Sequence, residues 1–91
     1  MTKKLTKMPH AQACVRIFDD GTTQLISYTT CAAEFGIDGW LTIHGLYSAT
    51  TRKHLSAFGV EYCNIPYSVI RHCYDNRLQY NIYTGEIRSK S

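Results

Sequence analysis

Residues 45–58, GLYSATTRKHLSAF, place three cationic or protonatable side chains at the expected start of a helix. Arg52, Lys53 and His54 follow two threonines there. A helix start carries positive partial charge, so each cation is locally unfavourable by about 0.3–1 kcal/mol. The pattern therefore indicates a phosphate site, to which helix-start N–H groups and threonine hydroxyls would add donors. The alternative is a solvated first turn with no partner.

A regular helix would spread these three side chains around its axis. With the inward direction set by the apolar positions from Leu55 to Tyr62, Lys53 points nearly straight out. Arg52 then lies about 70° from the inward direction on one side, and His54 about 90° on the other. This arrangement predicts a broad cationic helix end that could flank a nucleic-acid backbone, and not one tight anion pocket.

A second helix is expected after the connection Asn64-Ile65-Pro66, and it would offer Arg71 and Arg77. Two helices joined this way could form a helix-turn-helix whose second helix reads DNA. A short connection between two helices packed on a sheet would give the same sequence. Arg71 and Arg77 are therefore supporting candidates for the nucleic-acid site.

Seven tyrosines in 91 residues is a high number. Such amphipathic rings are favoured at protein interfaces and can also stack on nucleobases. Tyr47 and Tyr67 are expected near the ends of elements, and Tyr83 on the outward face of a strand. These three are the candidates for binding a partner, whereas the tyrosines on inward faces are expected in the core.

The four cysteines and four histidines could suggest a metal site or disulfides. No C-x-x-C pair occurs, and the spacings fit no zinc-finger pattern. We expect buried, reduced thiols that act as small hydrophobic groups, with zinc as the less favoured alternative, and no cofactor. The cysteines are Cys14, Cys31, Cys63 and Cys73.

Catalytic signatures are also absent from the sequence. It contains no P-loop, G-x-G-x-x-G, H-E-x-x-H or G-x-S-x-G motif, and its carboxylates are scattered. His72 and Cys73 are neighbours on the expected second helix, so they would point about 100° apart and form no dyad. We therefore expect no enzyme activity.

The elements that position these residues follow from changes in hydrophobic period. Alternating runs around Asp-Gly turns predict antiparallel hairpins, and the period then changes from 2 to 3.6 for two helices. The first helix should end near Cys63 or Asn64, and Pro66 should open the second, which ends at Asp75-Asn76. Strands are expected at 13–18, 23–30, 31–35, 40–44 and 78–83, with 86–88 compatible with a short return.

Strands grouped before helices predict the α+β class, with an antiparallel sheet of four N-terminal strands and a C-terminal strand, and two helices on one face. The length of 91 residues suits a single domain at 11–91, preceded by a flexible basic arm at 1–10. No apolar run approaches the ~18 residues of a transmembrane helix, and no secretory signal is recognisable. A cytoplasmic protein that does not contact membranes is the expectation.

Several short motifs resemble those of a known group of proteins. YTT at 28–30, GWLT at 39–42, GLYSATTRKH at 45–54 and YTGE at 83–86 carry the resemblance. They are similar to small uncharacterised proteins of conjugative and phage-like mobile elements of Gram-positive gut bacteria. The resemblance implies an intracellular accessory protein of a mobile element, and it brings no active site with it.

A net charge of +3 permits nucleic-acid binding without requiring it. The sequence thus predicts a small binding module that contacts nucleic acid through the basic helix start. The alternative is a protein-binding inhibitor or adaptor that acts on a host defence protein, in the manner of an anti-CRISPR protein.

Overall fold

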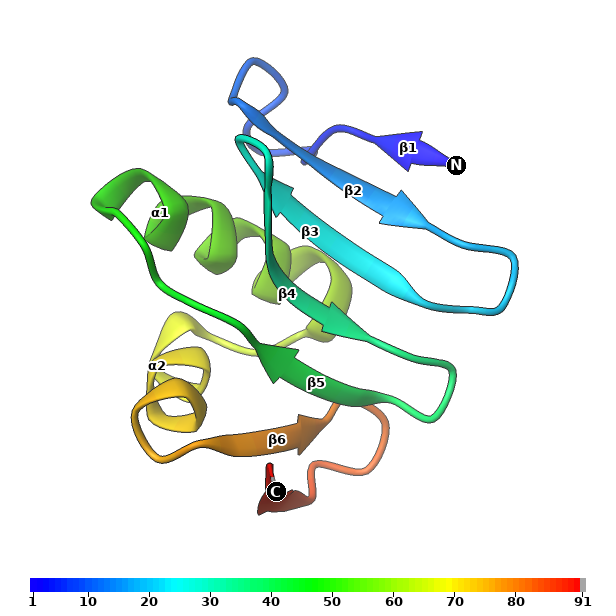
Figure 1. The fold of residues 1–91 in the computed structure, drawn as a ribbon, viewed down its shortest axis with the longest axis vertical. Helices are drawn as coiled ribbons and strands as arrows, with labels where there is room; N and C mark the ends of the chain where they lie inside the picture. Colours follow the sequence, from blue (N-terminus) through cyan, green and yellow to red (C-terminus); the bar gives the residue numbers. More distant parts are fainter. Residues whose placement is uncertain (91) are drawn as a thin grey trace.

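The computed structural model describes residues 1–90, which form one seven-stranded sheet with two helices on one of its faces (Figure 1). All neighbouring strands are antiparallel, and their order in the sheet follows the chain from β1 to β7. The α+β class predicted from the sequence is confirmed. The strands are β1 Thr2–Lys3, β2 Ala13–Ile17, β3 Thr23–Ser27, β4 Thr30–Phe35, β5 Trp40–Ile43, β6 Leu78–Asn81 and β7 Ile87–Ser89.

In the chain, the helical segment follows β5 and precedes β6. It consists of α1 (Ala49–Phe58), a π-helical turn η1 (Gly59–Cys63) and α2 (Tyr67–Asp75). Asn64 ends η1 in the left-handed conformation with φ 55°, which an asparagine tolerates. None of the helices in residues 1–90 is long and apolar enough to cross a membrane.

The two Asp-Gly turns form as predicted. Gly21 and Gly39 have φ of 91° and 86°, and they close the β2–β3 and β4–β5 hairpins. Such positive φ values cost glycine little, because it has no Cβ. The predicted hairpins therefore bring β2 to β5 together in the middle of the sheet.

A β-bulge interrupts the pairing of β3 with β4. Leu25 lies opposite Ala33 and Ile26 lies opposite Cys31, so Ala32 is the extra residue on β4. An extra residue exchanges the two faces of the strand beyond it, because side chains alternate with a period of two. Residues of β4 on the two sides of Ala32 therefore do not follow simple alternation.

The N-terminal residues are part of the domain and do not form the flexible arm expected from the sequence. β1 pairs with β2, and the side chain of Leu5 is fully buried in the core. Thr6 donates hydrogen bonds from its backbone N–H and its hydroxyl to the Glu61 carboxylate, both at 2.8 Å. A two-residue polar strand carries too little hydrophobic pattern to be predicted.

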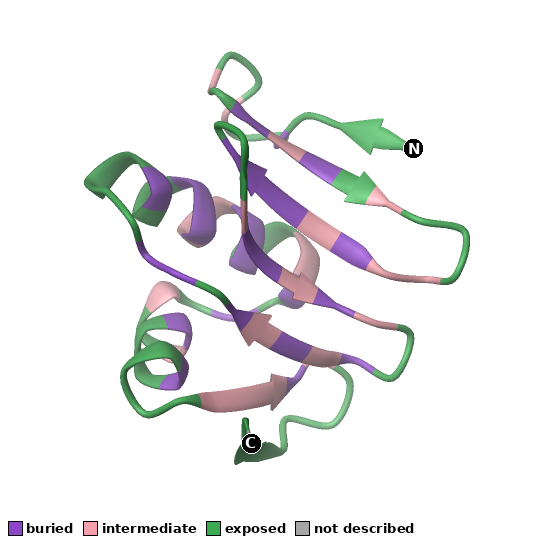
Figure 2. Cartoon of the chain, viewed as in Figure 1, coloured by how far each residue is buried: buried purple, intermediate pink, exposed green. Residues whose placement is uncertain are grey.

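The core lies between the sheet and the helices, and Figure 2 shows buried residues alternating with more exposed ones along the central strands. Leu55 and Phe58 of α1 pack there together with Ile70 of α2. No helix of residues 1–90 lies on the opposite face of β2 to β6, and we call it the open face. Surfaces available to a partner therefore include the outer side of the helices and the open face.

Candidate functional site

The start of α1 has the exposed cations that the sequence predicted. Ser48 caps the helix, and its hydroxyl accepts a hydrogen bond from the Thr51 N–H at 3.2 Å. The first turn contains no acidic residue, and Arg52 and Lys53 are both exposed to solvent. Arg52 thus ends the first turn and Lys53 follows it, with no acid in that turn to offset their charge.

His54 is not part of this surface, which corrects the prediction from the helical projection. Its side chain is only 1% exposed, and its Nδ1 lies 2.9 Å from the Ser27 hydroxyl. That hydroxyl lies 3.0 Å from the Thr51 hydroxyl, so the three polar groups form a buried network. Burial lowers the pKa of His54, which favours the neutral imidazole there.

The error has a specific geometric cause. The inward face of α1 is made by Thr51, His54, Leu55 and Phe58. The sequence projection continued a regular helix to Tyr62, whereas the chain changes to a π-helical turn after Phe58. The inferred inward direction was about 40° too far from His54, because the projection counted those later positions and left out Thr51 and His54.

A third cation joins Arg52 and Lys53 from the N-terminal segment. Lys7 and Lys53 line the same hollow, whose floor is largely apolar; its other lining residues are Met8, Ser56, Ala57 and Val60. Within residues 1–90 the close contacts between basic and acidic side chains are His44–Glu34 and Arg71–Asp75, so Lys7, Arg52 and Lys53 are in none of them. We call these three residues the α1 cationic surface.

The two supporting arginines lie elsewhere. Arg71 on α2 is paired with Asp75 at 3.0 Å, which offsets its charge locally. Arg77 follows α2 in a left-handed conformation with φ 54°, and it lines a groove together with Asp75 and Lys90. Neither arginine lines the hollow beside Lys53. The structure therefore does not unite the five predicted nucleic-acid residues in one site.

The three predicted partner-binding tyrosines are also dispersed. Tyr47 and Tyr83 are 60% and 66% exposed, whereas Tyr67 is half-buried and packs against the core. The ring of Tyr83 covers Gly39 and the ring of Tyr47 covers Gly45, and these glycines flank opposite ends of β5. The four-residue strand between them spans about 13 Å by itself, so the two exposed rings do not form one contact patch. A protein partner for them stays a prediction.

Comparison with known proteins gives one match. The sequence model of a family of unknown function, DUF8033, matches residues 3–68, which is most of the chain. The chain belongs to this family. No curated protein and no solved structure matches it. The part of this DUF8033 chain that matches includes Lys7, Arg52 and Lys53, and it ends before Arg71 and Arg77.

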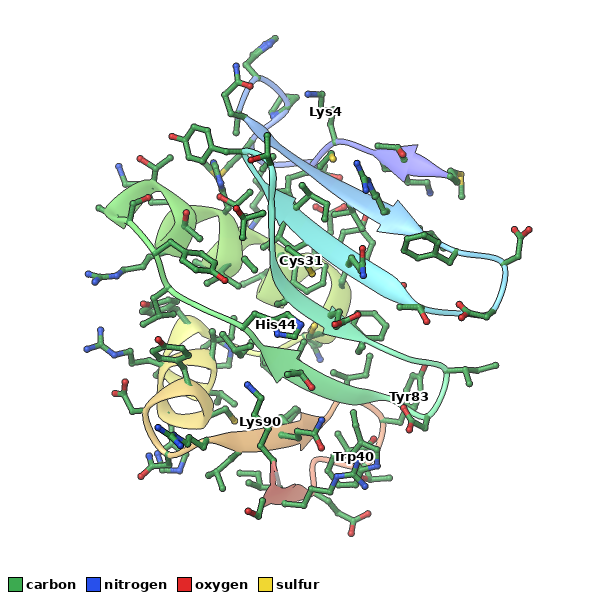
Figure 3. All side chains as sticks on the ribbon, in the orientation of Figure 1. Lys4, Cys31, Trp40, His44, Tyr83 and Lys90 are labelled. Carbon is green, nitrogen blue, oxygen red and sulfur yellow. The ribbon has the colours of Figure 1, made fainter. Side chains whose placement is uncertain are left out.

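The open face of this DUF8033 chain carries polar groups that the sequence did not single out as a site. The guanidinium of Arg88 lies 4.0 Å from the centroid of the Trp40 ring, and its Nε donates to the Gln79 side chain at 2.8 Å. Elsewhere on this face, Glu34 of β4 meets His44, which follows β5: an imidazole nitrogen of His44 lies 2.7 Å from the Glu34 carboxylate. Figure 3 shows Trp40 and His44 at different places along the sheet. These contacts join residues far apart in sequence, so spacing alone did not reveal them.

Hydrogen bonds govern the charge state of Glu34. Partial burial acts to raise the pKa of its carboxyl group, but hydrogen bonds from His44 and Gln24 outweigh that effect, so the pKa is lowered. Nearby, burial and the Glu34 charge both raise the pKa of the Cys31 thiol. Unless a metal ion binds it, the Cys31 thiol therefore stays protonated at neutral pH and is a poor nucleophile.

Proposed function

We propose that this DUF8033 protein is a nucleic-acid-binding module that contacts phosphates through the α1 cationic surface. The observation that supports the proposal is the shared hollow of Lys7 and Lys53, with Arg52 exposed on the same helix. None of the three is in an ion pair within residues 1–90, so their charge is available to an external anion.

Phosphate is the anion that this surface suits best. A cation in the first turn opposes the dipole, and a phosphate bound near Arg52 would interact favourably with both this cation and the helix start. The apolar floor of the hollow between the two lysines could lie against sugar carbons while the ammonium groups reach the backbone. Contacts of this type position a nucleic acid and do not read its sequence.

The number of cations sets a measurable salt dependence. Three phosphate contacts to duplex DNA predict a slope of about −2.7 for log affinity against log salt concentration. Raising the salt from about 50 to 200 mM should then weaken binding about 40-fold. Binding to a single strand should have a shallower slope of about −2.1, because fewer counterions are released per contact.

Fluorescence anisotropy with labelled random duplex and single strands tests the proposal. Lys53→Glu should abolish most of the binding at low salt, and Lys7→Glu should weaken it and make the salt slope shallower. Arg16→Glu is the matched control, because it makes the same charge change at an exposed position on β2, on the open face. Its binding should stay much closer to wild type.

Two results would overturn the proposal. The first is the absence of binding to any DNA or RNA at low salt. The second is a loss of binding in Arg16→Glu that equals or exceeds the loss in Lys53→Glu, because this would place the nucleic acid on the open face or show an effect of net charge alone.

A further inference from the structure

Three potential metal ligands from β4 and the end of β5 meet on the open face. Cys31, Glu34 and His44 each direct one ligand atom into the same space, and these atoms all lie within 4.8 Å of one another. Figure 3 shows Cys31 and His44 next to each other over the middle of the sheet. This cluster lies on β4 and β5, whereas the α1 cationic surface lies on the helix and the N-terminal segment.

The bulge in β4 creates the cluster. Cys31 and Glu34 are three residues apart, so in a regular strand they would point to opposite faces. The extra residue Ala32 brings both onto the open face, as their pairing with Ile26 and Gln24 shows. Ala32 also holds the backbone of His44, the third ligand, because the Ala32 carbonyl accepts a hydrogen bond from the His44 N–H at 2.8 Å.

We propose that Cys31, Glu34 and His44 form a zinc-binding site on the open face. Thiolate, imidazole and carboxylate are the three side-chain ligands that zinc uses in proteins, whereas calcium and magnesium require sites made of oxygen. Three protein ligands leave the fourth tetrahedral position for water. One cysteine thiolate and one carboxylate also balance the charge of a divalent ion.

The distances suit a tetrahedral ion after small side-chain adjustments. Bond lengths of about 2.0–2.3 Å place the ligand atoms of a tetrahedral zinc site about 3.3–3.6 Å apart. The widest separation, 4.8 Å at most, would contract, and the 2.7 Å contact between His44 and Glu34 would widen by about 0.6 Å. The side chains of His44 and Glu34 are 36% and 34% exposed, so an ion can reach them from solvent.

A neighbouring side chain already orients one ligand. The Gln24 amide donates to Glu34 Oε2 at 3.2 Å, which leaves Oε1 directed toward His44 and the proposed ion. Carboxylates that bind metals are commonly held by such a hydrogen bond, and its loss typically costs 10–100-fold in metal affinity. Gln24 would thus act as a positioning residue for the zinc site.

Zinc binding replaces protons in the cluster. The Cys31 thiol loses its proton when its sulfur binds the ion, and any proton held between His44 and Glu34 leaves the bonding nitrogen. No electron transfer is required, because zinc has no redox chemistry in proteins. The affinity should therefore increase with pH as these protons become easier to release.

Cobalt substitution provides a direct assay in the untagged, reduced chain of 91 residues. Titration with Co²⁺ should give one equivalent of tetrahedral absorption bands and a thiolate-to-cobalt charge-transfer band, and Zn²⁺ should displace both. Cys31→Ser should remove the charge-transfer band, and Gln24→Leu should lower the affinity at least 10-fold. Cys14→Ser is the matched control, since Cys14 is also half-buried but lies outside the cluster, and it should leave the spectrum unchanged.

A measurement on the wild-type chain avoids any folding defect of the variants. Alkylation followed by mass spectrometry should show that Zn²⁺ protects Cys31 and leaves the rate at Cys14 unaltered. Absence of stoichiometric Co²⁺ or Zn²⁺ binding at micromolar metal would overturn the proposal. A charge-transfer band that survives Cys31→Ser, or protection of Cys14 in place of Cys31, would overturn it equally.

Discussion

The close approach of α2 to the first residue of the π-helical turn gives a quantitative test of the packing. A Cβ added to Gly59 would lie 2.6 Å from Ile70 Cδ1 and 3.1 Å from the Ile65 carbonyl oxygen. Gly59 itself has an ordinary helical φ of −60°, so alanine would bring no backbone strain. Gly59→Ala therefore isolates the steric requirement, and Ile70→Val removes the atom that makes the shorter contact.

The expected magnitudes follow from opposing terms. Alanine gains about 1 kcal/mol over glycine in helix propensity, while overpacking a core costs typically 1–3 kcal/mol. Gly59→Ala should thus destabilise the fold by about 0–2 kcal/mol, and Ile70→Val alone by about 0.5–1.5 kcal/mol. In the double variant the main clash is absent. It should therefore be more stable, by about 1 kcal/mol or more, than the sum of the two single-variant changes in unfolding free energy predicts.

Urea unfolding of the wild type, both single variants and the double variant measures this coupling. Pairing Gly59→Ala with Ile43→Val is the control, because Ile43 is a buried isoleucine of β5 and is not among the atoms nearest to the added Cβ. The control pair should be additive within about 0.3–0.5 kcal/mol. Equal additivity in the Gly59 and Ile70 pair would refute the reasoning that Gly59 is required for close packing.

Three further results are expected. Burial lowers the pKa of His54, so the unfolded chain should take up a proton near pH 6.5 that native His54 does not. The free energy of unfolding should therefore fall as the pH drops below about 6.5. Urea titrations across that range should show a flatter pH dependence for His54→Gln. Leu5→Ala should cost about 2–5 kcal/mol and lower Tm by ~10 °C or more in calorimetry, whereas the exposed neighbour Lys4→Ala should change stability by less than about 0.5 kcal/mol. Burial raises the pKa of Cys63 to about 12, so mass spectrometry should find it alkylated far more slowly than half-buried Cys14 at mildly alkaline pH.

Local sequence signals predicted the frame of this fold because they act over a few residues. The Asp-Gly turns at Gly21 and Gly39 and the change of period before α1 each rest on neighbouring positions. The chain reversal at Asn64 was predictable for the same reason. Strand β1 was not, since its pairing with β2 and the burial of Leu5 depend on the assembled sheet.

The predicted site failed where the backbone departs from a regular period. The π-helical turn after Phe58 breaks the regular period from which the inward face was inferred, so the burial of His54 was missed. Arg52 and Lys53 are exposed as predicted because they lie far enough from the inward direction to tolerate that rotation. Lys7 was placed beside Lys53 only by the packing of the N-terminal segment, which no spacing rule describes.

The bulge at Ala32 has the same kind of effect on the open face. Two residues three positions apart share one face of a strand only when the alternation is interrupted, so the sequence spacing of Cys31 and Glu34 argues against a shared site. Bulges commonly redirect side chains next to functional sites. Deleting Ala32 would restore the alternation and return Cys31 and Glu34 to opposite faces, whereas substitutions at the ligands remove single donors. Loss of metal binding on that deletion, with the sheet retained, would therefore identify the bulge itself as the element that assembles the proposed zinc site.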